Sequence, residues 1–567
     1  MKARLSILFI LFFSQLFAQV GIGTINPEGQ LDIVSSTTGL VLPRVSRIEN
    51  VRTPGGDLAV DGTAVYDISR DAVCYRMAGS WVCVEIDDAG NPQLNLFDII
   101  YNGISNYVKA SNTTGQDYFG SSLAISEDGM YLAVGAYKES SSSTGINGSE
   151  SNSGANLSGA VYLFHRLGSV WTQEAFIKAS NTGAFDEFGK DLAISSDGSR
   201  LVVSAHLEDS NATGIDGDQN DNSMSNSGAV YIFVRTGSNW AQEAYIKSSN
   251  SESGDEFGHS VSMSSSGDRI AVSAIKEDSN ATGIAGDQND NSMSNSGAVY
   301  LFERAGGVWS QIGYFKSQTP EINGTFGESV SFSGDGLSFA VGAIKEDCGF
   351  ADNGYVYVFK DASGWSQDVR ICGYGDGAYH FGNSVSLNND GTRLAIGAQN
   401  DDSPSSGING TKNTGGSGSN DSGAAYVYFR SGGVWSEEAY IKASNPDGGD
   451  NFGHSVFLSP DGLRLAVGSW NEESNAQGIG GDQSDNSNNT CGAVYVFDRN
   501  GVTWSQKSYV KASNSDSSDK FGHEVSLTLN GVILVVSAQQ EDSNATGVNG
   551  DQSNNSEHNS GAVYIVE

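Results

Sequence analysis

Residues 186–235, "DEFGKDLAISSDGSRLVVSAHLEDSNATGIDGDQNDNSMSNSGAVYIFVR", return almost unchanged at residues 255–304 as "DEFGHSVSMSSSGDRIAVSAIKEDSNATGIAGDQNDNSMSNSGAVYLFER". The dipeptide Phe-Gly opens each copy and recurs seven times along the chain, at Phe119, Phe188, Phe257, Phe326, Phe381, Phe452 and Phe521. A second marker around "GAVY" also occurs seven times, at Ala160, Ala229, Ala298, Tyr355, Ala424, Ala493 and Ala562. Regular recurrence of this kind predicts seven repeated structural units.

Each copy contains four strand-like segments. In the second copy they are residues 190–195, 200–205, 228–235 and 240–249, rich in β-branched and aromatic residues and bounded by Gly, Asn, Asp and Ser. No later segment shows helical periodicity. Four-stranded units packed radially make a β-propeller, so we predict an all-β, seven-bladed β-propeller of four-stranded blades over residues 97–567.

The two ends of the propeller complement each other. The chain ends on "GAVYIVE", the third strand of the seventh copy, whereas "NYVKASN" at residues 106–112 matches a fourth strand. We therefore predict that residues 106–112 complete the last blade by pairing with residues 561–566, which removes exposed sheet edges. Because the last strand ends the sequence, we expect no C-terminal sorting domain.

The pattern "FG..V.LS.DG..LAVGA", followed by "GAVY.F", resembles the FG-GAP repeat, the blade unit of the integrin α-subunit head. The resemblance implies a seven-bladed propeller, and it is much less specific about function, because one fold hosts many functions. FG-GAP repeats often carry a D-x-D-x-D-G calcium loop between strands one and two. Here that loop is only "SEDG" (126–129), "SSDG" (195–198) or "SPDG" (459–462), which leaves too few oxygen ligands. We therefore do not carry the family's calcium sites over.

The N-terminus is typical of a secretory signal peptide, which we place at residues 1–18. Lys2 and Arg4 precede an apolar run, and Ala18 is the expected cleavage position. The run is too short to favour the alternative, a membrane anchor. We expect a secreted or cell-surface protein with no membrane insertion after cleavage.

Residues 19–96 begin with "VGIGTINPEGQLDIVSSTTGLVLPRVS". This segment resembles the N-terminal segments of Bacteroidota surface proteins and of phage tail-fibre-like proteins. The resemblance implies a stalk or attachment region through which the chain would form oligomers.

The chain has five cysteines. Cys74 and Cys83 flank a short hairpin centred on residues 78–79, which places them opposite each other, and we predict a disulfide between them. Cys348 and Cys372 are a candidate pair within the fourth copy. Cys491 stands where other copies have Ser, which indicates a small buried side chain. The sequence leaves the pairing of these last three open.

The formal net charge is −36, with 67 acidic and 31 basic residues. Such a surface repels nucleic acid and anionic membranes, so neither is an expected partner. Cations, basic proteins and neutral glycans remain as possible partners.

In an antiparallel meander the two–three loops and the four–one connections share one face, and the short turns share the other. We expect binding on the long-loop face, because loops on a rigid scaffold usually carry function. The candidate ligand-binding or metal-binding residues are Asp209, Asp216, Asp218, Asp221, Asp278, Asp287, Asp290, Asp482, Asp485, Asp542 and Asp551. These oxygens could wrap a hard cation such as calcium, or they could fix the turns of the loops; the second interpretation is favoured. The fourth copy lacks the loop, which predicts a notch there.

The residue after each Phe-Gly should line the central channel. These residues are Ser121, Lys190, His259, Glu328, Asn383, His454 and His523. The three histidines raise a metal hypothesis, and a solvated rim is the favoured alternative. Recurring Asp residues before Phe-Gly (Asp117, Asp186, Asp255, Asp450 and Asp519) and a recurring Trp at the start of strand four indicate structural roles.

The sequence therefore predicts a non-enzymatic, secreted or cell-surface binding or adhesion protein whose long-loop face binds a protein or a glycan. A structural envelope or matrix protein without a discrete ligand is the alternative. A polysaccharide-acting enzyme is the least favoured, and its only candidate residues are Asp376, Tyr379, His380, Asp401 and Asp402.

Overall fold

The structure is a computed structural model that describes the strand residues between 20 and 95 and residues 101, 103–374, 377–412 and 421–567. The chain divides into two compact units, Met1–Asp98 and Ile99–Glu567. No helix in the described part of the chain is long and apolar enough to cross a membrane. The predicted signal peptide lies outside the described residues and stays a prediction.

The N-terminal unit contains two small sheets. β1 (Val20–Ile22) pairs in parallel with β2 (Leu31–Ile33). The second sheet has the order β3 (Arg44–Val45), β4 (Ala64–Asp67), β5 (Ala72–Met77), β6 (Ser80–Ile86) and β7 (Pro92–Asn95). The β5–β6 register places Cys74 opposite Cys83, as predicted. Their side chains lie outside the described residues, so the disulfide stays a prediction.

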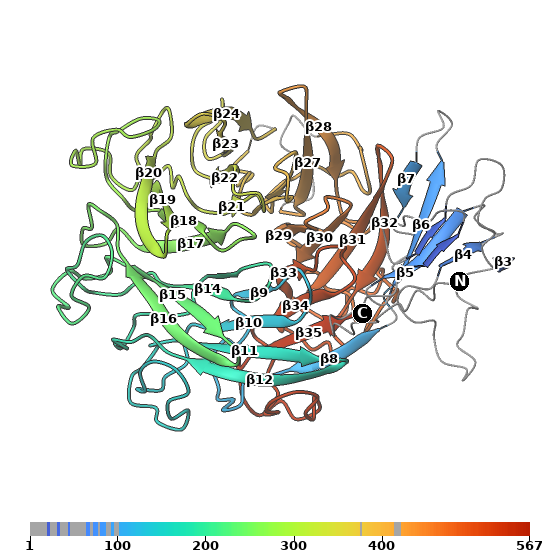
Figure 1. Ribbon diagram of the computed structural model, residues 1–567, viewed down its shortest axis with the longest axis horizontal. Helices are drawn as coiled ribbons and strands as arrows, with labels where there is room; N and C mark the ends of the chain where they lie inside the picture. Colours follow the sequence, from blue (N-terminus) through green and yellow to red (C-terminus); the bar gives the residue numbers. More distant parts are fainter. Residues whose placement is uncertain are drawn as a thin grey trace, which may run out of the picture. The chain divides into compact units, whose positions relative to one another are not determined.

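The second unit is a ring of seven four-stranded antiparallel sheets, shown in Figure 1. The first three blades are β9 (Leu123–Ile125), β10 (Tyr131–Ala136), β11 (Ala160–Leu167) and β12 (Val170–Ile177); β13 (Leu192–Ile194), β14 (Arg200–Ala205), β15 (Ala229–Thr236) and β16 (Asn239–Ile246); and β17 (Phe257–Met263), β18 (Arg269–Ala274), β19 (Ala298–Ala305) and β20 (Val308–Phe315). The fourth and fifth are β21 (Val330–Phe332), β22 (Ser338–Ala343), β23 (Tyr355–Asp361) and β24 (Trp365–Cys372); and β25 (Val385–Leu387), β26 (Arg393–Ala398), β27 (Ala424–Ser431) and β28 (Val434–Ile441). The last two are β29 (Phe452–Leu458), β30 (Arg464–Ser469), β31 (Ala493–Asn500) and β32 (Thr503–Val510); and β33 (Phe521–Leu527), β34 (Leu534–Ala538), β35 (Ala562–Val566) and β8 (Ile104–Val108). The predicted all-β propeller of seven four-stranded blades is confirmed.

The hydrophobic core lies between neighbouring blades. Every residue of β10, β22, β26 and β30 is buried, because a second strand is covered by a neighbouring blade on each face. Such strands are continuous apolar runs, unlike the alternating strands of a half-exposed sheet. One cluster, for example, packs Phe188 and Tyr231 of the second blade against Ala133 and Leu163 of the first. The ring is therefore held by contacts that repeat at each blade interface.

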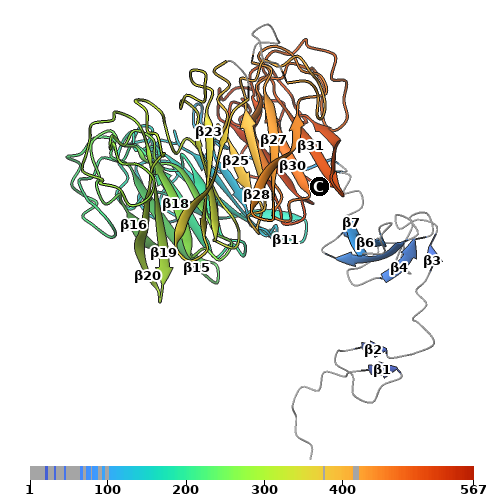
Figure 2. The same ribbon diagram turned by 90° about the horizontal axis from the view of Figure 1, so that it is seen from above.

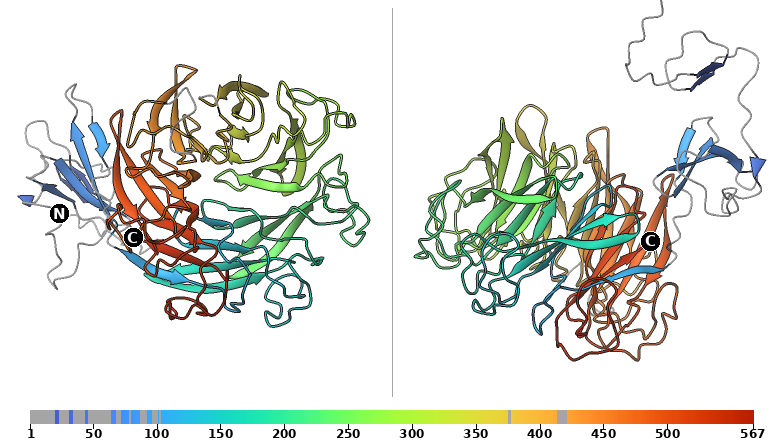
Figure 3. Two further views of the ribbon diagram at one scale, coloured as in Figure 1. Left: turned by 180° about the vertical axis from the view of Figure 1, so that it is seen from behind. Right: turned by 60° about the horizontal axis from the view of Figure 1, so that its bottom comes forward.

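The ring is closed by the two ends of the propeller sequence. β8 pairs antiparallel with β35, with Val108 opposite Val563 and Tyr107 opposite Tyr564. In Figure 3 the light-blue β8 lies beside the red β35 near the C-terminus. The predicted closure is confirmed, with the strand beginning two residues before the predicted segment and ending at Val108.

Candidate functional site

The two–three loops and the four–one connections meet on one face of the ring, away from the hairpin turns (Figure 2). In the second blade, Ile215 of the loop bridges to Ile246 at the end of β16. Asn181, on the connection that enters the blade, donates from Nδ2 to the backbone oxygen of Gln219 at 2.9 Å. Each long loop therefore folds back over its own blade and is held there by specific contacts.

A buried ion pair lies under the root of the loop in six blades. In the second blade, Lys247 follows β16 and donates from Nζ to Glu208 Oε2 at 2.9 Å and to Ser227 Oγ at 2.6 Å. The equivalent pairs are Lys109–Glu541, Lys178–Glu139, Lys316–Glu277, Lys442–Asp401 and Lys511–Glu472, all at 2.7–3.3 Å. All six lysines are fully buried. Burial lowers the pKa of the ammonium group in five of them, Lys109, Lys178, Lys247, Lys316 and Lys442. Sequence reasoning missed these pairs, although the recurring Lys and Glu were a visible signal.

The candidate aspartates of the loops mostly accept hydrogen bonds from loop backbone. Asp209 Oδ1 accepts from Asn226 N at 2.8 Å, and Asp216 Oδ1 accepts from Tyr245 N at 3.0 Å. The same kind of bond is made by Asp218, Asp278, Asp287, Asp290, Asp482, Asp542 and Asp551. Asp221 and Asp485 accept through their backbone carbonyls from Asn211 and Asn475.

These contacts agree with the turn-fixing interpretation. Among the described residues, no group of three or more His, Cys, Asp or Glu side chains is placed to hold a metal ion. Calcium binding stays a prediction.

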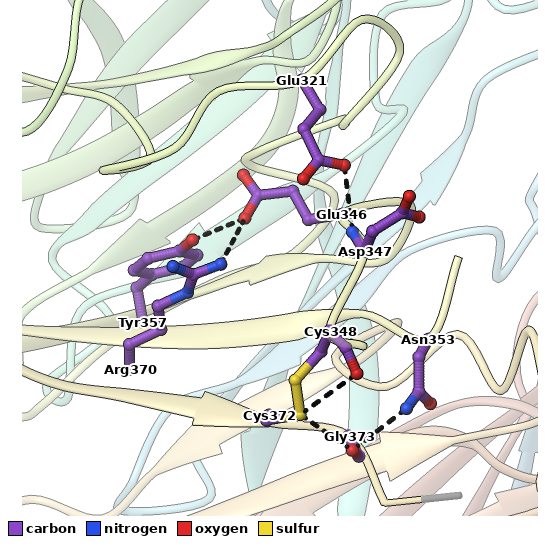
Figure 4. The surroundings of a disulfide bond; sticks show 9 residues. All are labelled: Glu321, Glu346, Asp347, Cys348, Asn353, Tyr357, Arg370, Cys372 and Gly373. Atoms are coloured by element: carbon purple, nitrogen blue, oxygen red, sulfur yellow. Dashed lines mark hydrogen bonds and ion pairs between the residues drawn. A yellow bond between two sulfur atoms is a disulfide. The ribbon is translucent and has the colours of Figure 1, made fainter. Parts of the chain in front are cut away.

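The fourth blade replaces its ion pair with a disulfide, shown in Figure 4. Cys372 occupies the position of the lysine and Cys348 that of a loop serine, and their bond confirms the candidate pair. Glu346 is left without a lysine: Tyr357 donates to its Oε2 at 2.5 Å and Arg370 lies 4.0 Å away. Burial raises the pKa of Glu346 to about 7. Only six residues, 347–352, separate Glu346 from Asn353, so this blade has no long loop, and the notch stays a prediction.

Cys491 is the free cysteine of the described residues and is buried, as predicted. Lys511 donates from Nζ to Cys491 Sγ at 2.9 Å, which is the contact that Ser227 makes in the second blade.

The innermost strands of all seven blades line a central channel with a volume of about 460 Å³. Side chains in its wall join neighbouring blades: Ser260 Oγ accepts from Val330 N at 3.2 Å and Ser384 Oγ from Val456 N at 3.0 Å. Asp191 takes the serine position in the second blade, and its Oδ2 accepts from Val261 N at 2.8 Å. These polar groups therefore hold neighbouring blades together along the channel wall.

Glu127 spans the channel at its short-turn end. Its Oε1 accepts from Ser265 Oγ at 2.5 Å, and its carboxylate also accepts from Asn389 Nδ2 at 3.2 Å. The three residues come from the first, third and fifth blades, so the contact crosses the ring. It obstructs this end, and access to the channel is favoured from the long-loop face.

The opposite end, the channel mouth, brings together two of the three predicted histidines. The ring of His454 lies 5.1 Å from that of His523 and stacks on Trp470 at 4.2 Å with an interplanar angle of 7°. His259 lies elsewhere, with its Nε2 3.9 Å from Glu328 Oε1. Trp470 was not singled out from the sequence, because it occupies a position that varies between copies.

The candidate enzyme residues have structural contacts. Asp401 is the buried partner of Lys442, and Asp402 Oδ1 accepts from Asp421 N at 2.8 Å. Tyr379 is buried, His380 is half-buried, and Asp376 lies outside the described residues. Nothing in these contacts favours the enzyme alternative.

The recurring Asp and Trp residues hold the scaffold, as predicted. Asp255 Oδ2 accepts from Glu252 N at 3.0 Å within the connection that enters the third blade. Trp309 of that blade donates from Nε1 to Glu243 of the second blade at 3.2 Å, beside Arg304 at 2.8 Å. The tryptophan thus helps to clamp two neighbouring blades together.

Comparisons with known proteins agree with this architecture. The FG-GAP repeat family matches residues 107–164, 171–233, 240–302 and 435–497, and the phage tail-like trimerisation region matches residues 21–96. The blades outside these FG-GAP matches have the same four strands. No curated protein matches the chain.

The solved structures to which the chain is similar include the following two. Hydrazine synthase from Kuenenia stuttgartiensis is 12% identical with a TM-score of 0.43, covering 75% of this chain and 93% of its own. A putative 6-phosphogluconolactonase from Bacteroides uniformis is 11% identical with a TM-score of 0.40, covering 76% and 93%. Likeness at this level says nothing about activity. The family matches and the seven observed blades together identify the chain as an FG-GAP repeat protein, in which the repeats form a seven-bladed β-propeller preceded by a phage tail-like trimerisation region.

Proposed function

We propose that this protein is a secreted or cell-surface binding protein without enzymatic activity, which uses the long-loop face of its propeller to bind a protein or a glycan. One observation carries the proposal: the long loops and the accessible end of the channel share a face, whereas Glu127 obstructs the other end. Long loops gathered on one face of a rigid scaffold are a frequent arrangement in recognition surfaces.

The N-terminal region supports a multivalent form of this function. A region that trimerises would present three propeller faces from one assembly. Linked sites of modest affinity bind a repetitive surface far more tightly than one site does, because each later contact is intramolecular. Adhesion to a cell or matrix surface fits this arrangement.

Loop replacement tests the proposal. In the test variant, each long loop is replaced with a copy of residues 347–352 in which Cys348 is changed to Ser. The residues of the buried ion pair on either side of the loop stay in place. The replaced segments are residues 209–226, 278–295, 473–490 and 542–559. We expect binding to cells or to a glycan array to be lost while the melting temperature stays close to that of the parent protein.

A matched control alters the opposite face. Val434 and Val502 lie at hairpin tips there, with 68% and 77% of their surfaces exposed. The Val434→Ser/Val502→Ser variant should bind like the parent. Binding that survives loop replacement would show that the long-loop face is not the site.

The structural alternative has one observation in its favour. The hairpin tips also expose Leu167, Val170 and Val308, so apolar side chains recur around the short-turn face. Exposed apolar groups of this kind promote association between molecules. Sedimentation of the isolated propeller distinguishes the two: a matrix protein self-associates through these tips, and a binding protein stays monomeric.

A further inference from the structure

The channel mouth is asymmetric in charge. On the side of the third and fourth blades, Lys276 lies 2.6 Å from Glu256 and His259 lies 3.9 Å from Glu328. On the side of the sixth and seventh blades, Lys520 makes no hydrogen bond or ion pair through its side chain with any described residue. Lys190 of the second blade makes none either, although its charge acts at longer range on Glu187 and Glu524. In a chain of net charge −36, two lysines without a directly contacting carboxylate at one corner of the channel mouth are unusual.

Lys520 contacts the His454–Trp470–His523 cluster, and the charge of Lys190 acts on it from a longer distance. Lys520 Nζ lies 4.0 Å from the centre of the Trp470 ring. Burial lowers the pKa of His454 to about 4 and that of His523 well below its usual value, and Lys190 and Lys520 add to both effects. Lys190 can act across the ring because the first blade places only Ser121 at the equivalent position.

The same corner holds polar groups without partners. Trp470 Nε1 and His523 Nδ1 are buried and make no hydrogen bond with any described residue. Glu524 stands where five blades have Ser and one has Asp, and its carboxyl has no hydrogen-bond partner within the described structure. Burial, with a contribution from Asp191, raises the pKa of Glu524 to about 8, so at neutral pH most of this carboxyl is protonated and can donate. The corner therefore offers positive charge and donors with nothing to receive them.

We propose that this corner of the channel mouth, formed by Lys190, His454, Lys520, His523 and Glu524, binds the carboxylate or sulfate group of an acidic polysaccharide. The inference rests on the proposed function and names its ligand class. Anions are stabilised where preorganised ammonium and hydrogen-bond donors converge in a partly desolvated cavity.

The cavity favours a sugar over an acidic protein. Its volume lies within the roughly 300–1,000 Å³ typical of small-ligand sites, and serines together with the amides of Asn383 and Gln399 line it. A chain end can enter such a narrow space, whereas a folded acidic surface would meet the aspartate-rich loops first. Those loops repel a chain end only weakly at physiological ionic strength, because screening acts over about 8 Å.

Anion binding should be coupled to proton uptake. A bound anion favours the charged forms of His454 and His523 and opposes ionisation of Glu524. The other charged groups that face them are Lys190 and Lys520, which oppose histidine protonation in the free protein, and Asp191, which opposes ionisation of Glu524. Gln399 accepts from His454 Nδ1 at 2.8 Å and leaves Nε2 to take up the proton. Affinity should therefore rise as the pH falls from 8 to 6.

Calorimetry on the full-length protein tests the inference with trigalacturonate, a sulfated trisaccharide and a neutral galactose trisaccharide as probes. We expect the acidic probes to bind and the neutral one to bind at least tenfold more weakly. Lys190→Gln and Lys520→Gln should each weaken binding about tenfold, whereas Lys276→Gln, which removes the same charge from a lysine already paired with Glu256, should change it less than twofold. Both Lys190 and Lys520 are half-buried, and melting temperatures check that the variants fold.

Three results would overturn the inference. They are equal binding of the neutral probe, equal losses in the Lys190→Gln and Lys276→Gln variants, and binding of a hexaglutamate peptide in preference to the saccharides. If no saccharide binds but loop replacement still abolishes cell binding, this inference fails and the proposed function stands. If saccharides bind through Lys190 while loop replacement changes nothing, the loops are not needed and only the mouth is a site.

Discussion

Five aspartates that precede Phe-Gly fix the backbone of the four–one connections on the long-loop face. Each is buried and accepts a backbone hydrogen bond from three residues upstream. Burial raises the pKa of Asp117, Asp186 and Asp450 to about 7 and that of Asp255 and Asp519 to about 8. The folded chain thus holds protons that the unfolded chain releases near pH 4. The contribution of these groups to stability is greatest below pH 4 and falls as the pH rises to about 8.

Asp255→Asn tests this linkage. The amide oxygen can still accept from Glu252 N, and the group no longer has to ionise in a buried site. We expect the variant to be more stable than the parent by about 1 kcal/mol or more at pH 8, with the difference shrinking as the pH falls and vanishing below pH 4. Urea denaturation across that range measures it. Asp287→Asn, in an exposed loop, is the control and should show no such pH-dependent gain; identical profiles for the two variants would contradict the argument.

The element on which each blade depends is the junction between the end of strand four and the root of the two–three loop. In six blades a buried ion pair connects the two segments of this junction, and in the fourth blade a disulfide connects them. Breaking a buried ion pair is expensive because the remaining charge has no solvent and no partner.

Lys247→Met should therefore destabilise the propeller by about 3 kcal/mol, because the Glu208 carboxylate remains buried without a positively charged partner. The Lys247→Met/Glu208→Gln double variant should recover part of that loss, since no buried charge remains. A double-mutant cycle by urea denaturation gives both values. A single variant that costs less than the double one would mean that the pair does not hold the junction.

At the scale of the whole propeller, the ring depends on β8. Tyr107 OH donates to Glu541 Oε1 at 2.8 Å and Lys109 Nζ to Glu541 Oε2 at 2.8 Å, so the closing segment also supplies the lysine of the ion pair in the seventh blade. Removing it exposes the edge of β35 and leaves Glu541 buried without its lysine.

Deletion of residues 101–112 should lower the melting temperature and cause association through the open edge of β35. The other interfaces repeat around the ring, so the loss need not unfold every blade at once. Calorimetry and sedimentation measure the two effects. Removal of residues 19–92 is the control and should leave the propeller's melting unchanged. A β8 deletion that melts like the parent and stays monomeric would contradict the closing role.

The sequence by itself determined the number of blades, their four strands, the ring closure and the face that carries the loops. It could do so because each depends on a local pattern that is repeated seven times, and repetition distinguishes a structural position from chance. Repetition also pointed to Cys348 and Cys372 as a candidate disulfide. Both cysteines lie in the fourth copy, at positions where the other copies have other residues.

Only the tertiary structure decided what lies in the channel. Lys190, His523 and Glu524 come from blades separated by more than three hundred residues, and Glu127 reaches Asn389 across the ring. No spacing in the sequence encodes such contacts, because they depend on side chains that converge on an axis shared by all seven blades. The buried lysine pairs were hidden for a related reason: a recurring charged residue is read from sequence as solvent-exposed until burial shows that its partner recurs with it.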